Sequence, residues 1–558
     1  MKQTLLSLIL LLQAATLVHA QGKQSSPPPA PAVPATIAPA SMTPVPAATP
    51  PATPAVEGKL DSIIGKIENN ERLDSKLDGI INRLDNSDRV ASKLDSILSA
   101  LKEHELKLEK IGTTPAAPPA TTAAAPAVAA VPAPAAPAPP APSGEISETQ
   151  WNINYVWIIV TASMVFFMQA GFVMLEIGAC RAKNTINIVM KSFLDFCICA
   201  IVFLLVGFAF MFGTSWNGVI GTDSFWLSSF PGDHKVWVFW FFQVGFAGVS
   251  CTIMSGAVAE RTKFLGYLMY CALFTALIYP VIGHWAWGSF GNAFGVGDGT
   301  KGWLEAMGFV DYAGSSVVHA CGGSCALAGI LAVGPRTGRF GPDGSPRLIA
   351  GHNIPLVTLG VLLLWFGWFG FNAGSSLSGS SMIGRLVVNT TISPSAAGIA
   401  AMISMWFIQG KPDVNIAMNG ALGGAVAITA CCGNVTPGAA IVIGAFGGMI
   451  TTVATIALER WKIDDAVGAV PVHLACGWWG TLCVALFDEK GFSIQRLGVQ
   501  ALGTLSISVY SFVVCTAVFA FIKFCVRIRA TEEEQINGLD FTEHAANAYP
   551  DFQTTEQA

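Results

Sequence analysis

Eleven long apolar segments follow residue 150, and they restrict this chain more than any other feature of its sequence. Each is close to the ~20 residues that an α-helix needs to cross a bilayer. Charged residues make up only 12% of the chain, against about 25% in soluble domains. We therefore expect an all-α, multi-pass membrane domain over residues 150–530. Its eleven transmembrane helices should lie at roughly 153–177, 190–213, 237–258, 264–284, 311–334, 354–374, 388–408, 415–432, 438–458, 466–487 and 500–525.

The first 145 residues differ in composition. Lys2, an apolar run and a small residue at Ala20 are typical of a cleaved signal peptide. The Ala/Pro-rich stretches cannot bury a core and should behave as extended spacers. We expect a signal peptide at 1–20, a Pro/Ala-rich disordered segment at 21–56, a repeat at 57–112 and an Ala/Pro linker at 113–145.

The repeat has a period of 17 residues. Lys59-Leu60-Asp61 recurs as Lys76-Leu77-Asp78 and as Lys93-Leu94-Asp95. Seventeen is two heptads plus three, which favours an extra-membrane coiled coil with a stammer in each repeat. The alternative is a solitary amphipathic helix lying on a surface. A coiled coil here could hold a trimer together or grip the cell envelope.

Positive charges are unevenly divided between the two sides. With eleven spans, Arg261, Arg336, Arg460 and Arg527 fall on one side, together with most other lysines and arginines near the spans. The positive-inside rule assigns this side to the cytoplasm. We expect an extracytoplasmic N-terminus and a cytoplasmic tail at 531–558. The host membrane would be a cell membrane or a bacterial inner membrane.

Two spans share an unusual spacing of Asp and His. Asp311 precedes His319 and Asp465 precedes His473, in both cases by eight residues (319 − 311 and 473 − 465). These are the fifth and tenth spans, which cross in opposite directions, as in an inverted repeat of five helices plus five before a final helix. A histidine in an apolar helix is costly unless it has a partner or lines a cavity. Either histidine alone could simply pack in its helix, but the pair is expected to meet near the middle of the bilayer.

Other chemistry has little support in the sequence. The net charge of -5 and the lack of a basic block argue against nucleic-acid binding. Two histidines are too few ligands for a zinc site, and we expect no metal, no cofactor and no enzyme activity. The 13 cysteines are read as helix-packing residues, with Cys431 and Cys432 as the pair to examine for redox chemistry. Aromatic residues near span ends form interfacial belts or a site for a small cation.

Several motifs together resemble the ammonium transporter (Amt/Mep/Rh) family. The resemblance spans about residues 150–550. It rests on Asp311 to Arg336, Arg181-Ala-Lys-Asn184, Ala259-Glu-Arg261, Trp368 to Ser375, Asp464-Asp465 with Val472-His473, and Gly538 to His544. Leu175-Glu176-Ile177-Gly178 departs from the aromatic-Gly-Gly run of many members. Glu176 and Asp195 are interpreted as structural partners.

The resemblance implies roles for individual residues. It implies an outer NH4+ recruitment site of Phe246, Trp287 and Ser375, a gate of Phe246 and Phe371, paired lumen histidines His319 and His473, pore lining by Trp368 and structural support from Asp311. It also implies a homotrimer with one pore per subunit. The tail would then be a candidate contact for a PII-type regulator, with Thr542 as a candidate phosphorylation site.

The expected activity is ammonium transport across the membrane. NH4+ would lose a proton, ammonia would pass an apolar pore, and the proton would follow along the histidines. Two alternatives stay open: an electroneutral ammonia channel, and an ammonium sensor that uses the same fold.

Overall fold

The structure of the protein is a computed structural model, and it describes residues 146–550. The signal peptide, the disordered segment, the coiled coil and the linker expected over residues 1–145 lie outside the described residues, as do residues 551–558.

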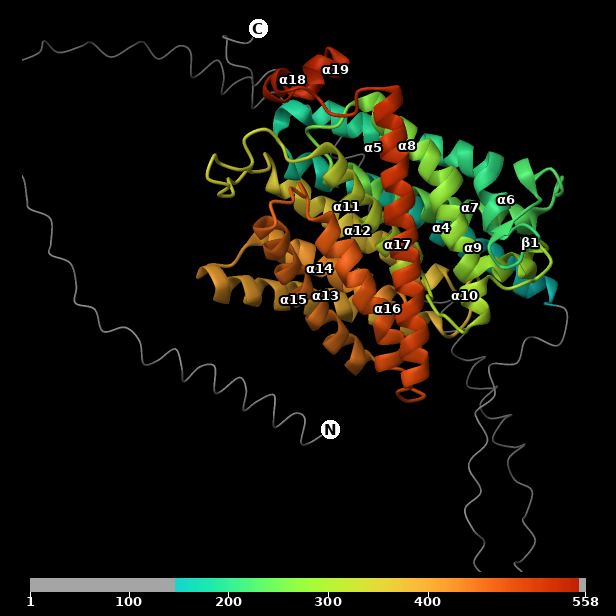
Figure 1. Ribbon diagram of the computed structural model, residues 1–558. Coiled ribbons are helices and arrows are strands. Elements are labelled where there is room, and N and C mark those ends of the chain that lie inside the picture. The colour runs from blue at the N-terminus through green and yellow to red at the C-terminus, as the bar shows by residue number, and fades with distance from the viewer. Residues whose placement is uncertain (1–145, 551–558) are drawn as a thin grey trace, which may run out of the picture. The chain divides into compact units, whose positions relative to one another are not determined.

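The membrane domain is a bundle of apolar helices (Figure 1). Within residues 146–550, nine helices are long and apolar enough to cross a bilayer. They are α4 (Glu148–Ala179), α5–η2–α6 (Thr185–Val202, Phe203–Gly207, Phe208–Phe212), α7 (His234–Ala257), α8–η4–α9 (Phe264–Leu273, Phe274–Ile278, Tyr279–Trp287), η6–α11 (Ser315–Ala320, Cys321–Val333), α12 (Ile354–Gly374), α13 (Ile383–Gln409), α15 (Pro437–Arg460) and α17 (Ile494–Cys525).

Two further apolar helices are shorter than we expected. They are α14 (Val414–Thr429) and the helix formed by η7 (Val470–Ala475) with α16 (Cys476–Leu486). At 1.5 Å per residue they are about 24–26 Å long, less than the ~30 Å hydrocarbon core. The C-terminal half of α14 is buried throughout, from Leu422 to Thr429. Packed among other helices, it does not have to match the thickness of the lipid.

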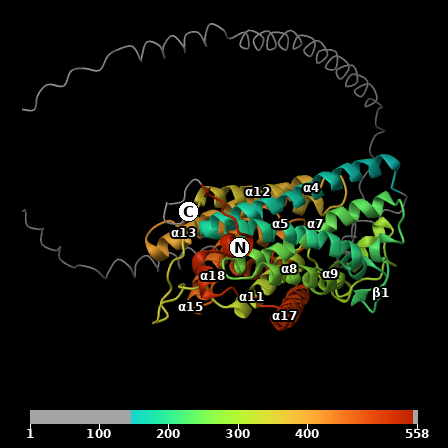
Figure 2. The same cartoon turned by 90° about the horizontal axis from the view of Figure 1, so that it is seen from above.

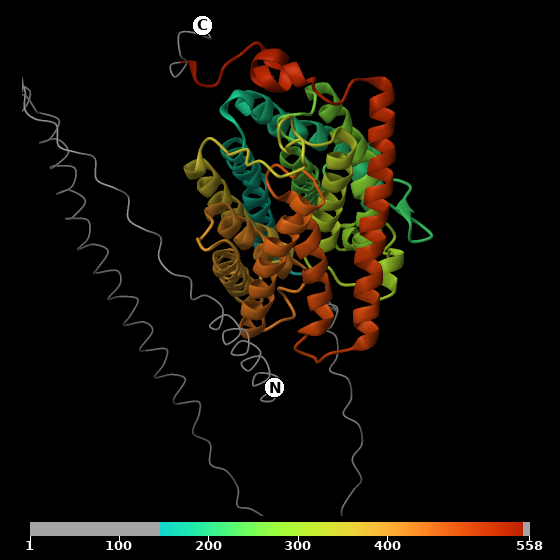
Figure 3. The same cartoon turned by 60° about the vertical axis from the view of Figure 1, so that its left-hand side comes forward.

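Short elements connect the spans. These are η1 (Ala182–Asn184), β1 (Ser215–Trp216) paired antiparallel with β2 (Ile220–Gly221), η3 (Phe225–Leu227), η5 (Gly288–Phe294) and α10 (Trp303–Ala306). The tail carries α18 (Glu532–Asn537) and α19 (Leu539–His544), which lie beyond one end of the bundle (Figure 3). We call this end the tail side; it is the side that the positive charges assign to the cytoplasm.

Helices α4 and α12 lie side by side at the edge of the domain (Figure 2). They run antiparallel, because Gly178 near the end of α4 faces Asn353 at the start of α12, while Gly374 at the end of α12 faces Thr161. Glycines at this seam let the two backbones approach closely. On another face of the bundle, α17 runs along almost the full height and packs against α11 and α16 (Figure 1).

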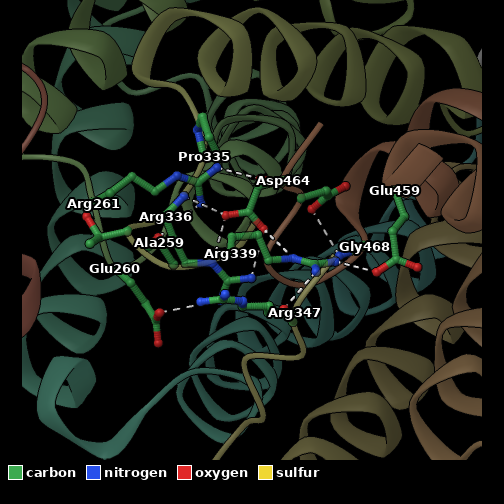
Figure 4. A network of polar contacts seen from close by, with 12 residues as sticks. Ala259, Glu260, Arg261, Pro335, Arg336, Arg339, Arg347, Glu459, Asp464 and Gly468 are labelled. Carbon is green, nitrogen blue, oxygen red and sulfur yellow. Dashed lines mark hydrogen bonds and ion pairs between the residues drawn. The ribbon is translucent and has the colours of Figure 1, made fainter. Parts of the chain in front are cut away.

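A buried ionic network ties loops together on the tail side (Figure 4). Arg336 donates through Nη2 to Asp464 Oδ1 at 2.9 Å and contacts Glu260 Oε2 through Nη1 at 3.4 Å. Arg181 binds the same Glu260 oxygen at 2.7 Å, and Arg339 Nε lies 3.3 Å from Asp464 Oδ1. The desolvation cost of burying these charges is offset because each has a partner of opposite sign.

The tail helices dock on this side through specific contacts. Lys263 Nζ contacts Glu534 Oε1 at 2.5 Å and Glu543 Oε1 at 2.8 Å. The backbone N–H of Asn187 also donates to Asp540 Oδ1 of α19 at 2.8 Å. The tail up to His544 is therefore built into the structure of the tail side.

Candidate functional site

The two histidines singled out by their spacing meet in the interior. His319 Nδ1 and His473 Nδ1 are 3.1 Å apart, and the rings are nearly parallel, with centroids 5.2 Å apart. His319 is fully buried and His473 is 6% exposed. One nitrogen must donate and the other accept, so the two imidazoles share a single proton between them.

Both histidines sit in matching local structure. Each lies in a π-helical turn at the start of its helix, η6 for His319 and η7 for His473. Asp311 accepts hydrogen bonds from the backbone N–H groups of Gly314, Ser315, Ser316 and Val317 at 2.8–3.0 Å. Asp465 accepts from Gly468, Ala469 and Val470 in the same way. The shared spacing therefore encodes a capped, wide turn that points a histidine inward.

Aromatic rings lead to the histidine pair from the side opposite the tail. Trp287, at the end of α9, meets Phe246 on α7 edge to face at 6.3 Å between centroids. Phe246 stacks on Phe371 of α12 at 4.1 Å, and Phe371 lies 5.4 Å from His319. The stacked pair Phe246 and Phe371 is almost fully buried. The expected gate residues thus form one continuous file with the expected pore histidines.

Trp368 flanks this file. Its ring stacks on His319 with centroids 5.1 Å apart, and its Nε1 donates to Thr429 Oγ1 at 2.9 Å. Thr429 was not anticipated from the sequence, because nothing in its own helix marks it. The hydrogen bond satisfies the buried indole N–H and fixes the ring beside the histidine.

Ser375 and Trp287 lie at the mouth of the file. Ser375 follows Phe371 by one helical turn, and its Oγ donates to the Phe371 carbonyl at 2.8 Å. This orientation leaves the oxygen lone pairs free to accept a hydrogen bond from a ligand. Trp287 Nε1 donates to the Asp311 carbonyl at 2.8 Å, so Asp311 supports the mouth through its backbone as well as its side chain.

A small cavity lies on the tail side of the histidines. Phe172 of α4 lies beside His473 with ring centroids 6.4 Å apart. Both residues line the cavity, and Glu176 is part of its wall. Neither Phe172 nor Glu176 was expected to line the pore.

Among the described residues, no group of three or more His, Cys, Asp or Glu side chains is arranged to hold a metal ion. Cys431 and Cys432 are buried free thiols in the turn after α14, and they contact backbone carbonyls of α14 at 3.6 and 3.7 Å. The chemistry available at the site is therefore cation–π attraction, hydrogen bonding and proton sharing between imidazoles.

The sequence is similar to those of known proteins. The sequence profile described as the Ammonium Transporter Family matches residues 156–549. The ammonium transporter Amt2 of Archaeoglobus fulgidus is 40% identical over 431 residues, which cover 72% of this chain and 90% of that protein.

Solved structures agree with this match. One described as a Sensor Amt Protein superposes with a TM-score of 0.69 at 40% identity, covering 72% of this chain and 100% of its own. Mep2 of Candida albicans superposes with a TM-score of 0.62 at 26% identity, covering 69% of this chain and 87% of its own.

Proposed function

This chain belongs to the ammonium transporter family, and from that premise we propose that it recruits NH4+ at Phe246, Trp287 and Ser375, deprotonates it, and passes ammonia along the histidine pair. The proton follows separately through His319 and His473, so that the net cargo is NH4+. The observation that carries this proposal is the unbroken file of rings ending in two imidazoles 3.1 Å apart.

Recognition at the mouth needs more than ion size, because ammonium and potassium have similar size and equal charge. Aromatic faces attract either cation by about 0.5–2 kcal/mol. The free lone pairs of Ser375 add discrimination, since NH4+ donates hydrogen bonds and K+ cannot. Trp287 and Phe246 supply the ring faces next to it.

Passage below the mouth favours the neutral molecule. The stacked rings of Phe246 and Phe371 leave no polar group to replace the water around a cation. An unpaired charge in such surroundings costs at least a few kcal/mol. Loss of a proton removes this cost for ammonium, and a potassium ion has no equivalent route.

The histidine pair then serves both products of the deprotonation. Ammonia forms hydrogen bonds to the imidazoles, and the shared proton can move from one ring nitrogen to the other. His319 Nε2 has no hydrogen-bond partner among the described residues, so it is free to donate or accept a hydrogen bond.

The test is methylammonium uptake with simultaneous current in proteoliposomes. Wild type is expected to show both, and His319→Ala with His473→Ala should lose the current by at least about tenfold. Full uptake and unchanged discrimination against K+ in the double variant would contradict the role of the histidines. Uptake by wild type without any charge movement would instead identify an electroneutral ammonia channel.

A sensor is the second candidate function, because the similar Sensor Amt Protein carries that description. In a sensor, ammonium would change the conformation of the tail without sustained uptake. Proteolysis of α18 and α19 with and without ammonium, measured beside uptake, separates the two: altered cleavage without uptake favours the sensor.

Assembly and regulation extend the proposal. We expect a homotrimer with one pore per subunit and an extracytoplasmic N-terminus. The docked tail is a candidate surface for a PII-type regulator, because Glu532 and Glu533 place acidic side chains in the first turn of α18.

Deleting residues 57–112 tests the coiled coil expected there. An intact trimer with normal uptake would show that the coiled coil is needed for neither assembly nor transport.

A further inference from the structure

Helices α4 and α12 pack symmetrically: a contact made by a residue of α4 on α12 is matched by an equivalent contact of α12 on α4. A Cβ added at Gly171 would lie 2.8 Å from Leu364 Cγ, and one added at Gly367 would lie 2.1 Å from Met168 Cγ. The two pairs are related by one offset, because 367 − 171 and 364 − 168 are both 196. The seam therefore follows a local twofold axis, and residues 196 apart occupy equivalent places in the two halves.

This register pairs pore residues on the two sides of the histidines. Phe172 corresponds to Trp368, and these rings lie beside His473 and His319 respectively. Leu175 corresponds to the gate residue Phe371 by the same offset. The tail-side cavity is thus the counterpart of the gated half of the pore.

The pair that follows Leu175 and Phe371 differs in charge between the two halves. Glu176 corresponds to Asn372. Asn372 is a neutral amide that donates through Nδ2 to Thr390 Oγ1 at 3.0 Å. Glu176 is a carboxyl group that accepts from Ser192 Oγ at 3.2 Å and from Ser255 Oγ. Only the tail-side member of the pair can bind and release a proton.

Glu176 and His473 line the same small cavity. The cavity gives the centre of a water-sized molecule about 20 Å³, and one water needs roughly 10–15 Å³. His473 and Phe172 lie in its wall with Glu176, and Glu176 is the one carboxylate among the described residues that line it. The cavity that both side chains line therefore has room for a single water or ammonia molecule.

Other charged groups near Glu176 have partners of their own. Asp195 on α5 accepts from Gln169, Thr252 and Tyr267. Lys191 Nζ donates to the Thr262 carbonyl at 2.5 Å. Neither side chain is part of the cavity wall, so Glu176 is the group placed to exchange a proton with the pore.

We propose that Glu176 is the proton carrier on the tail side of the pore, taking the proton that leaves His473 and returning it to ammonia. In the first step the carboxylate accepts a proton, through the cavity, from the imidazolium form of His473. A new O–H bond forms as the N–H bond breaks, and His473 returns to its neutral imidazole form. In the second step the carboxylic acid gives the same proton to ammonia, which leaves as NH4+ and restores the carboxylate. This inference rests on the proposed proton relay and adds its missing acceptor.

The experiment compares Glu176→Gln, Glu176→Asp and Asp195→Asn in proteoliposomes, normalised to folded protein. Asp195→Asn is the matched control, because it neutralises a buried carboxylate outside the cavity wall. We expect Glu176→Gln to lower the ammonium current by at least about tenfold, as for loss of a general acid–base group. Glu176→Asp should retain part of the current, and Asp195→Asn should keep most of it.

Each failure has a distinct signature. Wild-type uptake without current contradicts the relay itself, whereas normal wild-type current that persists in Glu176→Gln contradicts only the role of Glu176. Equal loss in Asp195→Asn also contradicts it. If Glu176→Gln does not fold, infrared difference spectra decide: ammonium must change a protonated-carboxyl band in wild type, and Glu176→Asp must shift that band. An unshifted band overturns the proposal.

Discussion

Asp311 shows how one side chain can cap the start of a helix inside a membrane domain. Its two carboxylate oxygens accept from four consecutive backbone N–H groups, which no helical carbonyl reaches at the start of η6. In an apolar interior these groups have no water to replace the carboxylate. The position of His319, eight residues after Asp311, depends on this cap.

Asp311→Ala is therefore expected to lower stability by about 3–5 kcal/mol, because several buried donors lose their acceptor. Asp311→Asn should lose less, since one oxygen remains. The measurement is the midpoint of thermal unfolding in detergent. Asp413→Ala is the control: Asp413 caps α14 through one N–H, that of Ile416, and should cost about 1 kcal/mol. Equal losses would contradict the assigned role of Asp311.

At the scale of elements, close packing of small residues sets the positions of α13, α14 and α15. A Cβ added at Gly448 of α15 would lie 2.0 Å from the Ala397 carbonyl oxygen of α13, and one at Gly424 of α14 would lie 2.3 Å from Ala397 Cβ. Lipid supplies no hydrophobic drive between helices, so such contacts carry much of the packing energy.

Gly448→Ala should push α15 away from α13 and lower stability by about 1–3 kcal/mol, with a lower folded yield. Gly498→Ala in α17 is the matched control, because a Cβ there meets nothing within 4 Å. It should leave the unfolding midpoint unchanged or raise stability by up to about 1 kcal/mol. An unfolding midpoint and folded yield of Gly448→Ala that match those of wild type and Gly498→Ala would show that the seam between α13 and α15 tolerates the extra methyl group.

At the scale of the whole molecule, the tail-side ionic network joins parts of the chain far apart in sequence. Arg336 contacts Glu260, after α7, and Asp464, before η7 (Figure 4). Burial alone would raise the pKa of Asp464, but the hydrogen bond from Arg336 and the charge of Arg261 hold that pKa well below its usual range. Burial likewise opposes the charged form of Glu260, and Arg336 still keeps its pKa below the usual value.

A lowered folded-state pKa makes stability depend on pH with a definite sign. The contribution of Asp464 is fully present above its unfolded pKa of about 3.9 and is lost as pH falls through the lower folded value. We expect the unfolding midpoint of wild type to fall steeply below about pH 4. Asp464→Asn should be less stable at neutral pH by about 3–5 kcal/mol and should fall less on acidification, because an amide does not titrate.

The control for this prediction is Glu489→Gln. Glu489 pairs with Arg385 at 2.7 Å, but both side chains are about one third or more exposed, so the change should cost at most about 1 kcal/mol. Identical acid profiles for wild type and Asp464→Asn would show that the network does not link protonation to stability.

The sequence by itself determined the spans, the histidine pair and the family, because apolar length and the Asp-to-His spacing are properties of single segments. It also located the file of aromatic residues through the family resemblance. It included α14 and the helix from Val470 to Leu486 among the spans but made both longer than they are in the structure. The C-terminal half of α14 is buried, so it does not have to match the thickness of the lipid.

Only the tertiary structure decided which side chains line the same cavity. Glu176 was read from the sequence as a structural partner, and nothing in α4 alone places it in one cavity with His473. The signal existed as a repeated pattern, Gly171, Glu176 and Gly178 against Gly367, Asn372 and Gly374. Its meaning depends on the register between two helices 196 residues apart, and that register is set by glycine contacts across the seam rather than by any property of one helix.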